Sequence, residues 1–184
     1  SASHHVIKAH YIKIKTVGGL LIDKKRNTLV AYFSATGVIA TAAKTIADAI
    51  GAELFEIKPE TPYTSEELDW NNPESRSTIE MKDTSFRPAI SLMAPDMDKY
   101  DLVFIGFPIW WFTAPTIINT FLESYDFSGK TIVPFATSLG SDIAKAEKDL
   151  PPSCSSSTQW KSGKVLSGIT KSEALAWIDS LNLD

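Results

Sequence analysis

The sequence predicts an α/β fold: a three-layer, doubly wound, five-stranded parallel sheet with helices on both faces. Short apolar runs rich in β-branched and aromatic residues alternate with amphipathic helical segments about five times. The strongest run, residues 101–107, is apolar throughout after its first residue, as expected for a strand buried on both faces. The length of 184 residues suits a single domain of this kind.

Residues 1–26 stand apart from this pattern. Residues 5–17 alternate in part between apolar and polar, and Gly18-Gly19 follows them as a turn. The segment is therefore interpreted either as an appended hairpin or as the remnant of an expression tag. The regular domain is expected to span residues 27–184.

The first half of the domain begins with two predicted strands, residues 28–33 and 53–57. The segment between them has apolar residues on one helical face, at spacings of four, three and four: Ile39, Ala43, Ile46 and Ile50. Gly51 is expected to end this helix.

Residues 59–99 are polar and Pro-rich, and they lack a clean periodicity. About forty residues are too many for a bare loop in a compact domain, so a helix is expected inside the segment. We expect it to begin at Thr64, with Glu67 as the partner of Thr64 in a capping box.

The second half continues the alternation. Pro115 is expected to open a helix, and residues 130–136 form the next predicted strand. Ser141 is expected to cap a short helix that Pro151-Pro152 would end. The inner face of the first of these helices is expected to contain Ile118, Phe121, Leu122 and Tyr125.

The end of the chain is predicted to hold a short strand at residues 164–166 and a closing helix. Thr170 and Glu173 have the spacing of a capping box at the start of that helix. Its apolar face is expected to consist of Ala174, Leu175, Trp177, Ile178 and Leu181.

Charge is unevenly distributed along the chain. The whole chain has a formal net charge of −4, whereas residues 27–184 hold 12 bases and 21 acids, a net charge of −9. An acidic body is a poor partner for nucleic acid and favours a basic protein partner, because opposite fields steer encounter. The sequence does not indicate an oligomeric state.

The predicted compartment is the cytoplasm. One cysteine, Cys154, allows no internal disulfide, which suits a reducing compartment. No run of about 18 apolar residues predicts a membrane span. Lysines interrupt the apolar positions near the N-terminus, unlike those of a signal peptide.

Three loops are expected at the carboxyl end of the sheet, where doubly wound proteins bind ligands. The first, residues 34–39, leads into a helix N-terminus, and its hydroxyls and glycine suit a phosphate. The second, residues 107–113, has four aromatic residues in six positions, whose faces can stack on a flat heterocycle. The third, residues 136–142, has small residues that let backbone amides approach a ligand.

Each loop also has a plainer interpretation when it is considered alone. The first can be a simple strand-to-helix turn, the second an aromatic core cluster or a protein interface, and the third a capped surface loop. The presence of all three at one end of the sheet favours a ligand site. The first loop has neither GxxxxGK nor GxGxxG, which argues against a Walker loop and a Rossmann dinucleotide site.

The sequence suggests no catalytic residue and no metal ligand. All three histidines lie in residues 1–26, so a His general base is not expected in the domain. No cluster of Cys and His has the spacing of a metal site.

Four segments are similar to flavodoxins of bacteria: YFSATG at 32–37, TPYTSEELDWNNPESRSTIEM at 61–81, GFPIWWFTAPTIINTFLESYDFSGKT at 106–131, and PFATSLGSD at 134–142. The resemblance covers the chain from residue 27 onward. It implies a flavodoxin-like sheet with strand order 2-1-3-4-5. It also implies that flavin mononucleotide (FMN) binds with its phosphate in the first loop and its isoalloxazine ring between the other two.

The FMN-binding residues that the resemblance implies lie in these loops. The first loop supplies Ser34, Ala35, Thr36, Gly37, Val38 and Ile39. The second loop supplies Pro108, Ile109, Trp110, Trp111 and Phe112. The third loop supplies Thr137, Ser138, Leu139, Gly140 and Asp142.

Three of these residues depart from the usual flavodoxin pattern. Ile39 stands where the phosphate loop usually ends in threonine. Leu139 and Asp142 stand where the third loop often has glycine.

The leading functional prediction is an FMN-binding electron-transfer protein of the oxidoreductase class, without a substrate of its own. The three loops contain no Lys or Arg that would stabilise an anionic reduced flavin, which predicts a low-potential one-electron carrier. Two alternatives stay open on the same fold: an FMN-dependent NAD(P)H:quinone-type oxidoreductase, and an interaction module that has lost FMN.

Overall fold

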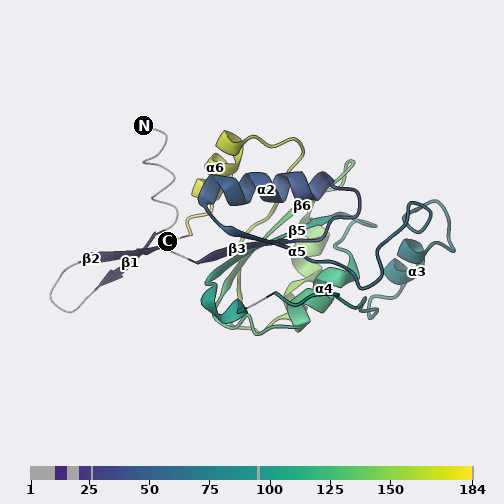
Figure 1. The fold of residues 1–184 in the computed structure, drawn as a ribbon, viewed down its shortest axis with the longest axis horizontal. Helices are drawn as coiled ribbons and strands as arrows, with labels where there is room; N and C mark the ends of the chain where they lie inside the picture. Colours follow the sequence, from purple (N-terminus) through teal and green to yellow (C-terminus); the bar gives the residue numbers. More distant parts are fainter. Residues whose placement is uncertain (1–10, 16–20, 26, 95, 184) are drawn as a thin grey trace.

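The computed structural model describes residues 11–15, 21–25, 27–94 and 96–183. Within the N-terminal extension, β1 (Tyr11–Lys15) pairs antiparallel with β2 (Leu21–Lys25). This pair forms a two-stranded sheet of its own, apart from the main sheet (Figure 1). The predicted turn at Gly18-Gly19 lies outside the described residues.

The main sheet is parallel throughout and follows the order β4-β3-β5-β6-β7, with β8 also paired to β6. Its strands are β3 (Thr28–Tyr32), β4 (Glu53–Glu56), β5 (Leu102–Pro108), β6 (Thr131–Thr137), β7 (Gln159–Trp160) and β8 (Lys164–Val165). The predicted order 2-1-3-4-5 is confirmed, with the fifth position shared by β7 and β8.

The sequence prediction for the fifth position missed β7. The pairing with β6 breaks off after Ile132 and resumes at Phe135. Between these residues, Gly163 passes so close to β6 that a Cβ atom there would lie 2.5 Å from the carbonyl oxygen of Pro134. Proline has no N–H for a ladder bond, so two short strands replace one continuous strand.

Helices cover both faces of this sheet (Figure 1). They are α2 (Val38–Ile50), α3 (Arg76–Lys82), α4 (Thr116–Glu123), α5 (Ala144–Asp149) and α6 (Lys171–Ser180), with short 3-10 turns η1 (Met97–Lys99) and η2 (Pro151–Ser153). Alternate residues of the strands pack into two cores, one beneath α2 and α6 and the other beneath α4 and α5. The three-layer prediction is confirmed.

The helices that flank the sheet largely follow the sequence pattern. All four apolar residues predicted for α2 are buried, and Gly51 ends the helix with a left-handed φ of 66°. The capping box of α6 is present, with Thr170 and Glu173 bonded reciprocally. Pro115 is the N-cap of α4. Tyr125 lies beyond the end of α4 and is half-buried.

A helix exists within residues 59–99, but the predicted start at Thr64 is wrong. The reciprocal bonds of Thr64 and Glu67 do form, at 3.0 and 3.2 Å, yet they close only a turn. Asp69 and Asn72 then accept N–H bonds from residues two positions later, which draws the backbone out of the helical path. The helix, α3, begins later, after its N-cap Ser75.

The predicted cap at Ser141 is also wrong. The N–H of Ser141 donates to the hydroxyl of Ser138 at 2.8 Å, so Ser141 belongs to the loop. Asp142 instead accepts the N–H of Ala144, the first residue of α5, at 3.1 Å. The N-cap residue of α5 is Ile143, and no side chain caps this helix.

Gly106 in β5 provides a test of this packing. It pairs in register with Phe135, and a Cβ atom at Gly106 would collide with the Phe135 ring. We expect Gly106→Ala to lower the free energy of unfolding by about 1–3 kcal/mol, measured by urea denaturation. Phe135→Leu should make room for the added methyl group, so additive losses in the double variant would contradict this account.

Candidate functional site

The three predicted loops emerge side by side at the carboxyl edge of the sheet. Tyr32, the last residue of β3, pairs with Gly106 of β5, and Pro108 of β5 pairs with Thr137 of β6. The N–H of Ile109 then donates to the carbonyl of Thr137 at 2.9 Å, which joins the second loop to the third. The parallel register therefore brings the predicted site residues to one edge.

The first loop wraps tightly before α2. The hydroxyl oxygen of Ser34 accepts the N–H of Gly37 at 2.9 Å, and Gly37 has a left-handed φ of 92°. No side chain caps α2, and its first turn holds no acidic residue. The N–H groups of that turn therefore face no competing carboxylate, a favourable arrangement for a bound anion.

A cavity of about 440 Å³ lies beside this loop, lined by Thr36, Gly37 and Val38 together with residues of α2 and residues 166–169. Ile39 does not share in it through its side chain, which is 1% exposed and packs in the core beneath α2. The substitution of the usual threonine by Ile39 therefore serves core packing, and only the backbone N–H of Ile39 is left for a ligand.

The second loop is a two-residue hairpin turn. The N–H of Trp110 donates to the carbonyl of Thr113 at 2.9 Å, and the reverse bond measures 3.0 Å. The two central residues, Trp111 and Phe112, have left-handed φ values of 46° and 69°. Turns of this geometry usually contain Asn and Gly, because the left-handed conformation costs other residues roughly 1–2 kcal/mol each. This turn therefore stores strain at two aromatic positions.

The third loop is organised by Ser138, whose hydroxyl oxygen accepts the N–H groups of Gly140 and Ser141 at 3.2 and 2.8 Å. The side chain of Leu139 is fully exposed. The exposed carboxylate of Asp142 accepts the N–H of Ala144, two residues later, and does not cap α5. Both departures from the family pattern in this loop therefore place an exposed side chain there.

An aromatic cluster that the sequence analysis missed supports the second loop. Trp110 meets Phe33 and Tyr63 edge to face, with ring centroids 5.6 and 5.5 Å apart. Phe33 and Tyr63 also meet edge to face at 5.8 Å. Tyr63 belongs to the segment 59–99, which is thereby anchored at the edge where the three loops emerge.

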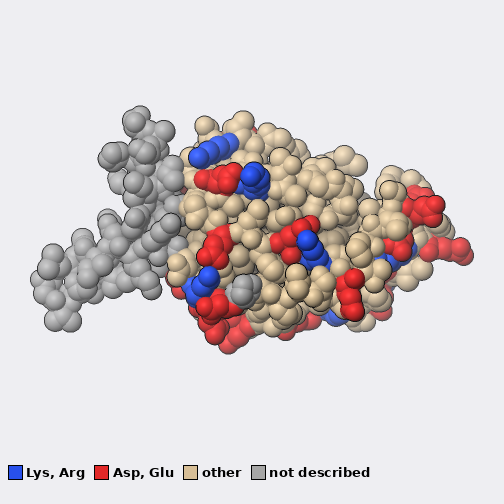
Figure 2. Space-filling view, in the orientation of Figure 1, with Lys and Arg blue, Asp and Glu red and all other residues tan. Residues whose placement is uncertain are grey.

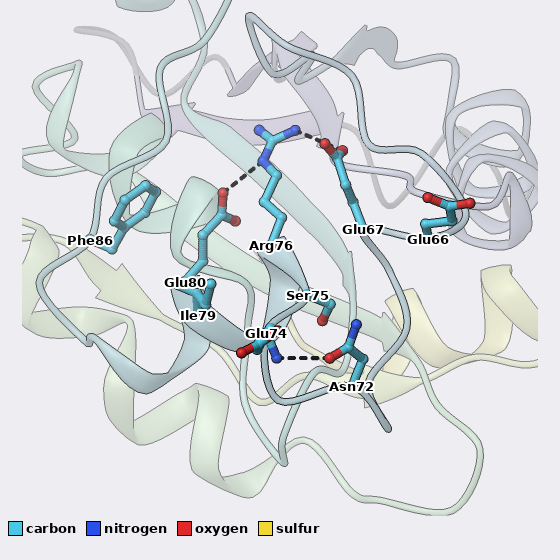
Figure 3. A pocket seen from close by; sticks show the side chains of 9 residues that line it. All are labelled: Glu66, Glu67, Asn72, Glu74, Ser75, Arg76, Ile79, Glu80 and Phe86. Atoms are coloured by element: carbon cyan, nitrogen blue, oxygen red, sulfur yellow. Dashed lines mark hydrogen bonds and ion pairs between the residues drawn. The ribbon is translucent and has the colours of Figure 1, made fainter.

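Arg76 of α3 holds Tyr63 in this cluster. Its guanidinium carbon lies 3.8 Å from the centre of the Tyr63 ring, and its Nε donates to Glu80 at 2.9 Å. The Tyr63 hydroxyl donates to the other carboxylate oxygen of Glu80. Figure 3 shows the guanidinium of Arg76 between the carboxylates of Glu67 and Glu80, at the wall of a cavity of about 620 Å³.

Two sequence features hinted at this cluster. Glu67 was expected as a capping residue, and Tyr63 and Arg76 lie within the family-like block at 61–81. Their meeting was not visible in the sequence, because 13 positions separate Tyr63 from Arg76 and 47 separate Tyr63 from Trp110. No periodicity links residues so far apart.

Acidic side chains gather at the end of the molecule formed by α3 and the preceding turns (Figure 2). Glu66, Glu67 and Glu74 lie around the cavity in this region. The three loops themselves contain one charged residue, Asp142. The acidic surface around α3 and the loop edge, with its single charge, are therefore distinct parts of the molecule.

Cys154 and the tryptophans outside the second loop have no role at the loop edge that the structure shows. Burial raises the pKa of the half-buried Cys154 thiol to about 11, which keeps the thiol protonated. Trp177 is buried, Trp160 packs against a core, and Trp70 is exposed. The described residues include neither a group of His, Cys, Asp and Glu suited to a metal ion nor a helix able to cross a membrane.

The sequence as a whole identifies the family. A model of the flavodoxin family matches residues 27–181. The chain belongs to the flavodoxin family. No protein of curated function matches this flavodoxin in sequence.

Solved structures agree with this membership. A candidate flavoprotein from Bacteroides eggerthii is 47% identical, with a TM-score of 0.82 over 86% of this chain and 99% of that chain. Another from Bacteroides uniformis is also 47% identical, with a TM-score of 0.80 over 85% and 99%. A Lactobacillus acidophilus flavoprotein in complex with FMN shares the fold at 22% identity, with a TM-score of 0.64 over 85% and 98%.

Tyr63 gives this flavodoxin a testable pH dependence. Burial, and then the hydrogen bond to Glu80, raise the pKa of Tyr63 above its ordinary value. The folded state therefore keeps the proton after the unfolded chain begins to lose it near pH 10, so stability falls as the pH rises beyond that point. We expect the free energy of unfolding to fall less steeply between about pH 9 and 11 in Tyr63→Phe, by at most about 1.4 kcal/mol per pH unit. Parallel curves for the two proteins would contradict the burial of this hydroxyl.

Proposed function

We propose that this flavodoxin binds FMN at the carboxyl edge of its sheet and carries electrons between proteins. The observation that supports it best is the meeting of two features at one edge: an α2 N-terminus without a capping side chain, and a turn that presents aromatic residues. The first suits a phosphate, and the second suits a flat ring. The FMN complex of the Lactobacillus acidophilus flavoprotein, which has the same fold, supports the same cofactor.

The residues present fit this cofactor. Ser34, Thr36 and the N–H groups at the start of α2 would hold the phosphate beside the 440 Å³ cavity. Trp110, Trp111 and Phe112 would flank the ring from the second loop, and the backbone around Ser138 would flank it from the third. Bound FMN would supply the electron-transfer chemistry, and the protein would set its orientation and electrostatics.

We further propose that the carrier works at low potential and one electron at a time. The anionic, fully reduced flavin would meet no cation from the three loops, because they contain no Lys or Arg. The negative net charge of the domain disfavours an added negative charge as well.

A basic redox protein in the cytoplasm is the partner that we propose. The acidic side chains around the α3 end (Figure 2) would attract such a partner from a distance. A single cysteine, which allows no internal disulfide, suits a reducing compartment.

A reductase acting on a small molecule is the second candidate function. A cavity of about 560 Å³ is lined by Trp111 and Thr113 of the second loop together with residues of α4 and α5. Such an enzyme needs a substrate pocket beside the flavin, and this cavity adjoins Trp111, a residue proposed to flank the ring. Steady oxidation of NADH or NADPH by the FMN-loaded protein would favour the reductase over the carrier.

Cofactor binding is tested by the visible spectrum of purified protein after incubation with excess FMN and desalting. We expect a persistent flavin spectrum with quenched fluorescence. A colourless protein would overturn the proposal and favour an interaction module.

Gly37→Ala should weaken FMN binding at least about tenfold, because an alanine strains the left-handed backbone of the phosphate loop. Gly129→Ala is the matched control: its φ is 73°, an added Cβ meets no atom within 4 Å at either glycine, and Gly129 precedes β6 at the opposite edge.

The proposed redox tuning is tested by adding a cation at the fully exposed Leu139. We expect Leu139→Lys to raise the midpoint potential for the second electron by roughly 40 mV, the equivalent of about 1 kcal/mol for one electron. Gln159→Lys adds the same charge at the amino end of β6, where Gln159 pairs with Thr131, and should leave the potential unchanged. Equal shifts in the two variants would show that net charge, and not the loop edge, sets the potential.

A further inference from the structure

The second loop holds two bulky residues in a conformation that its sequence does not favour. Four non-glycine residues among those described have a left-handed φ: Asp96, Trp111, Phe112 and Asn182. Asp and Asn tolerate this conformation because their short polar side chains bond locally, whereas Trp and Phe have no such compensation. The turn at Trp111 and Phe112 must therefore be held in place by its surroundings.

Burial of the Trp111 and Phe112 side chains is not what keeps the turn in this conformation. Phe112 is 68% exposed and Trp111 is 39% exposed. The contacts are made instead by the residues on either side of them. Thr113 donates its hydroxyl to Asp149 of α5 at 2.7 Å, and Trp110 packs edge to face against Phe33 and Tyr63.

The contacts that support Trp110 extend through Tyr63 to α3. Tyr63 lies in a segment without regular structure, so it needs its own support to press against Trp110. Arg76 provides that support by stacking on the Tyr63 ring and by binding Glu80, which also accepts the Tyr63 hydroxyl. The Arg76 Nη1 additionally donates to the carbonyl of Thr61 at 2.8 Å, which fixes the backbone two residues before Tyr63.

We propose that Arg76 and Tyr63 are positioning residues that clamp the strained turn, so that Trp111 and Phe112 are presented to the flavin ring. The inference rests on the proposed FMN binding. It gives the segment 59–99 a role at the cofactor site, exerted through Trp110.

The test compares Tyr63→Ala and Arg76→Ala with the wild type, using FMN affinity and amide hydrogen exchange of the cofactor-free protein. We expect FMN affinity to fall at least about tenfold and the amides of Trp110 and Thr113 to exchange at least about tenfold faster. Arg87→Ala is the matched control, since it removes an ion pair between the same segment and Glu123 of α4, at 2.9 Å. It should change both quantities less than about twofold.

Phe112→Gly separates clamping from a general loosening of the fold. Glycine relieves the left-handed strain at position 112 and leaves Trp111 as the one strained residue of the turn, so the turn should depend less on its clamp. Tyr63→Ala made in the Phe112→Gly background should therefore accelerate exchange at Trp110 and Thr113 less than about threefold. A full tenfold acceleration in that background, or equal effects of Arg76→Ala and Arg87→Ala, would overturn the clamp.

Failure of FMN binding is distinguishable from failure of the clamp. If the wild type binds no FMN, the proposed function falls, while hydrogen exchange still reports on the clamp. If the wild type binds FMN, and Tyr63→Ala and Arg76→Ala bind it as tightly, the clamp is wrong and the proposed function stands.

Discussion

The parallel pairing of β5 with β3 on one side and β6 on the other is the constraint on which the site depends. Parallel strands deliver their carboxyl ends to one edge, so the loops after these three strands must meet there. The pairing is secured by burial of β5 on both faces and by the Phe135 ring, which lies against the backbone of Gly106. A slip of one residue would exchange the two cores and displace every loop.

The segment 59–99 is attached to this parallel sheet by contacts of its side chains. Its polar sequence buries little on its own, and it gains order through a few concentrated contacts. Arg76 serves as the hub, because a planar guanidinium can stack on Tyr63 and bind Glu80 at the same time. The polar atoms of Arg76, Glu80 and Tyr63 are largely hydrogen-bonded to one another, which limits the free-energy cost of removing their charges from water. A region that looks like a long loop in sequence is thus joined to the edge of the sheet where the three loops emerge.

Much of the fold was predictable because local patterns agree with the tertiary structure. The apolar run of β5, the one-sided face of α2 and the capping box of α6 each carry their structure within a short stretch of sequence. The start of α3 was not predictable in this way, since Thr64 and Glu67 form the right bonds but Asp69 and Asn72 redirect the chain. The locations of the three loops at the edge of the sheet were predictable from the sequence. The contact of Tyr63 with Trp110 was not, because it joins segments that are distant in the sequence.

The three departures from the family pattern take on a different meaning in three dimensions. In the sequence alone, Ile39 removes a threonine from the phosphate loop, and Leu139 and Asp142 remove glycines from the third loop. In the fold, Ile39 fills the core, Leu139 is exposed to solvent and Asp142 accepts the N–H of Ala144. None of the three side chains fills the edge between the loops, so the backbone groups that would bind a phosphate and a ring keep their arrangement. The strained turn at Trp111 and Phe112 also indicates that the arrangement of the loops is maintained. Its left-handed backbone disfavours folding, and it persists because the contacts around it are strong enough to maintain it.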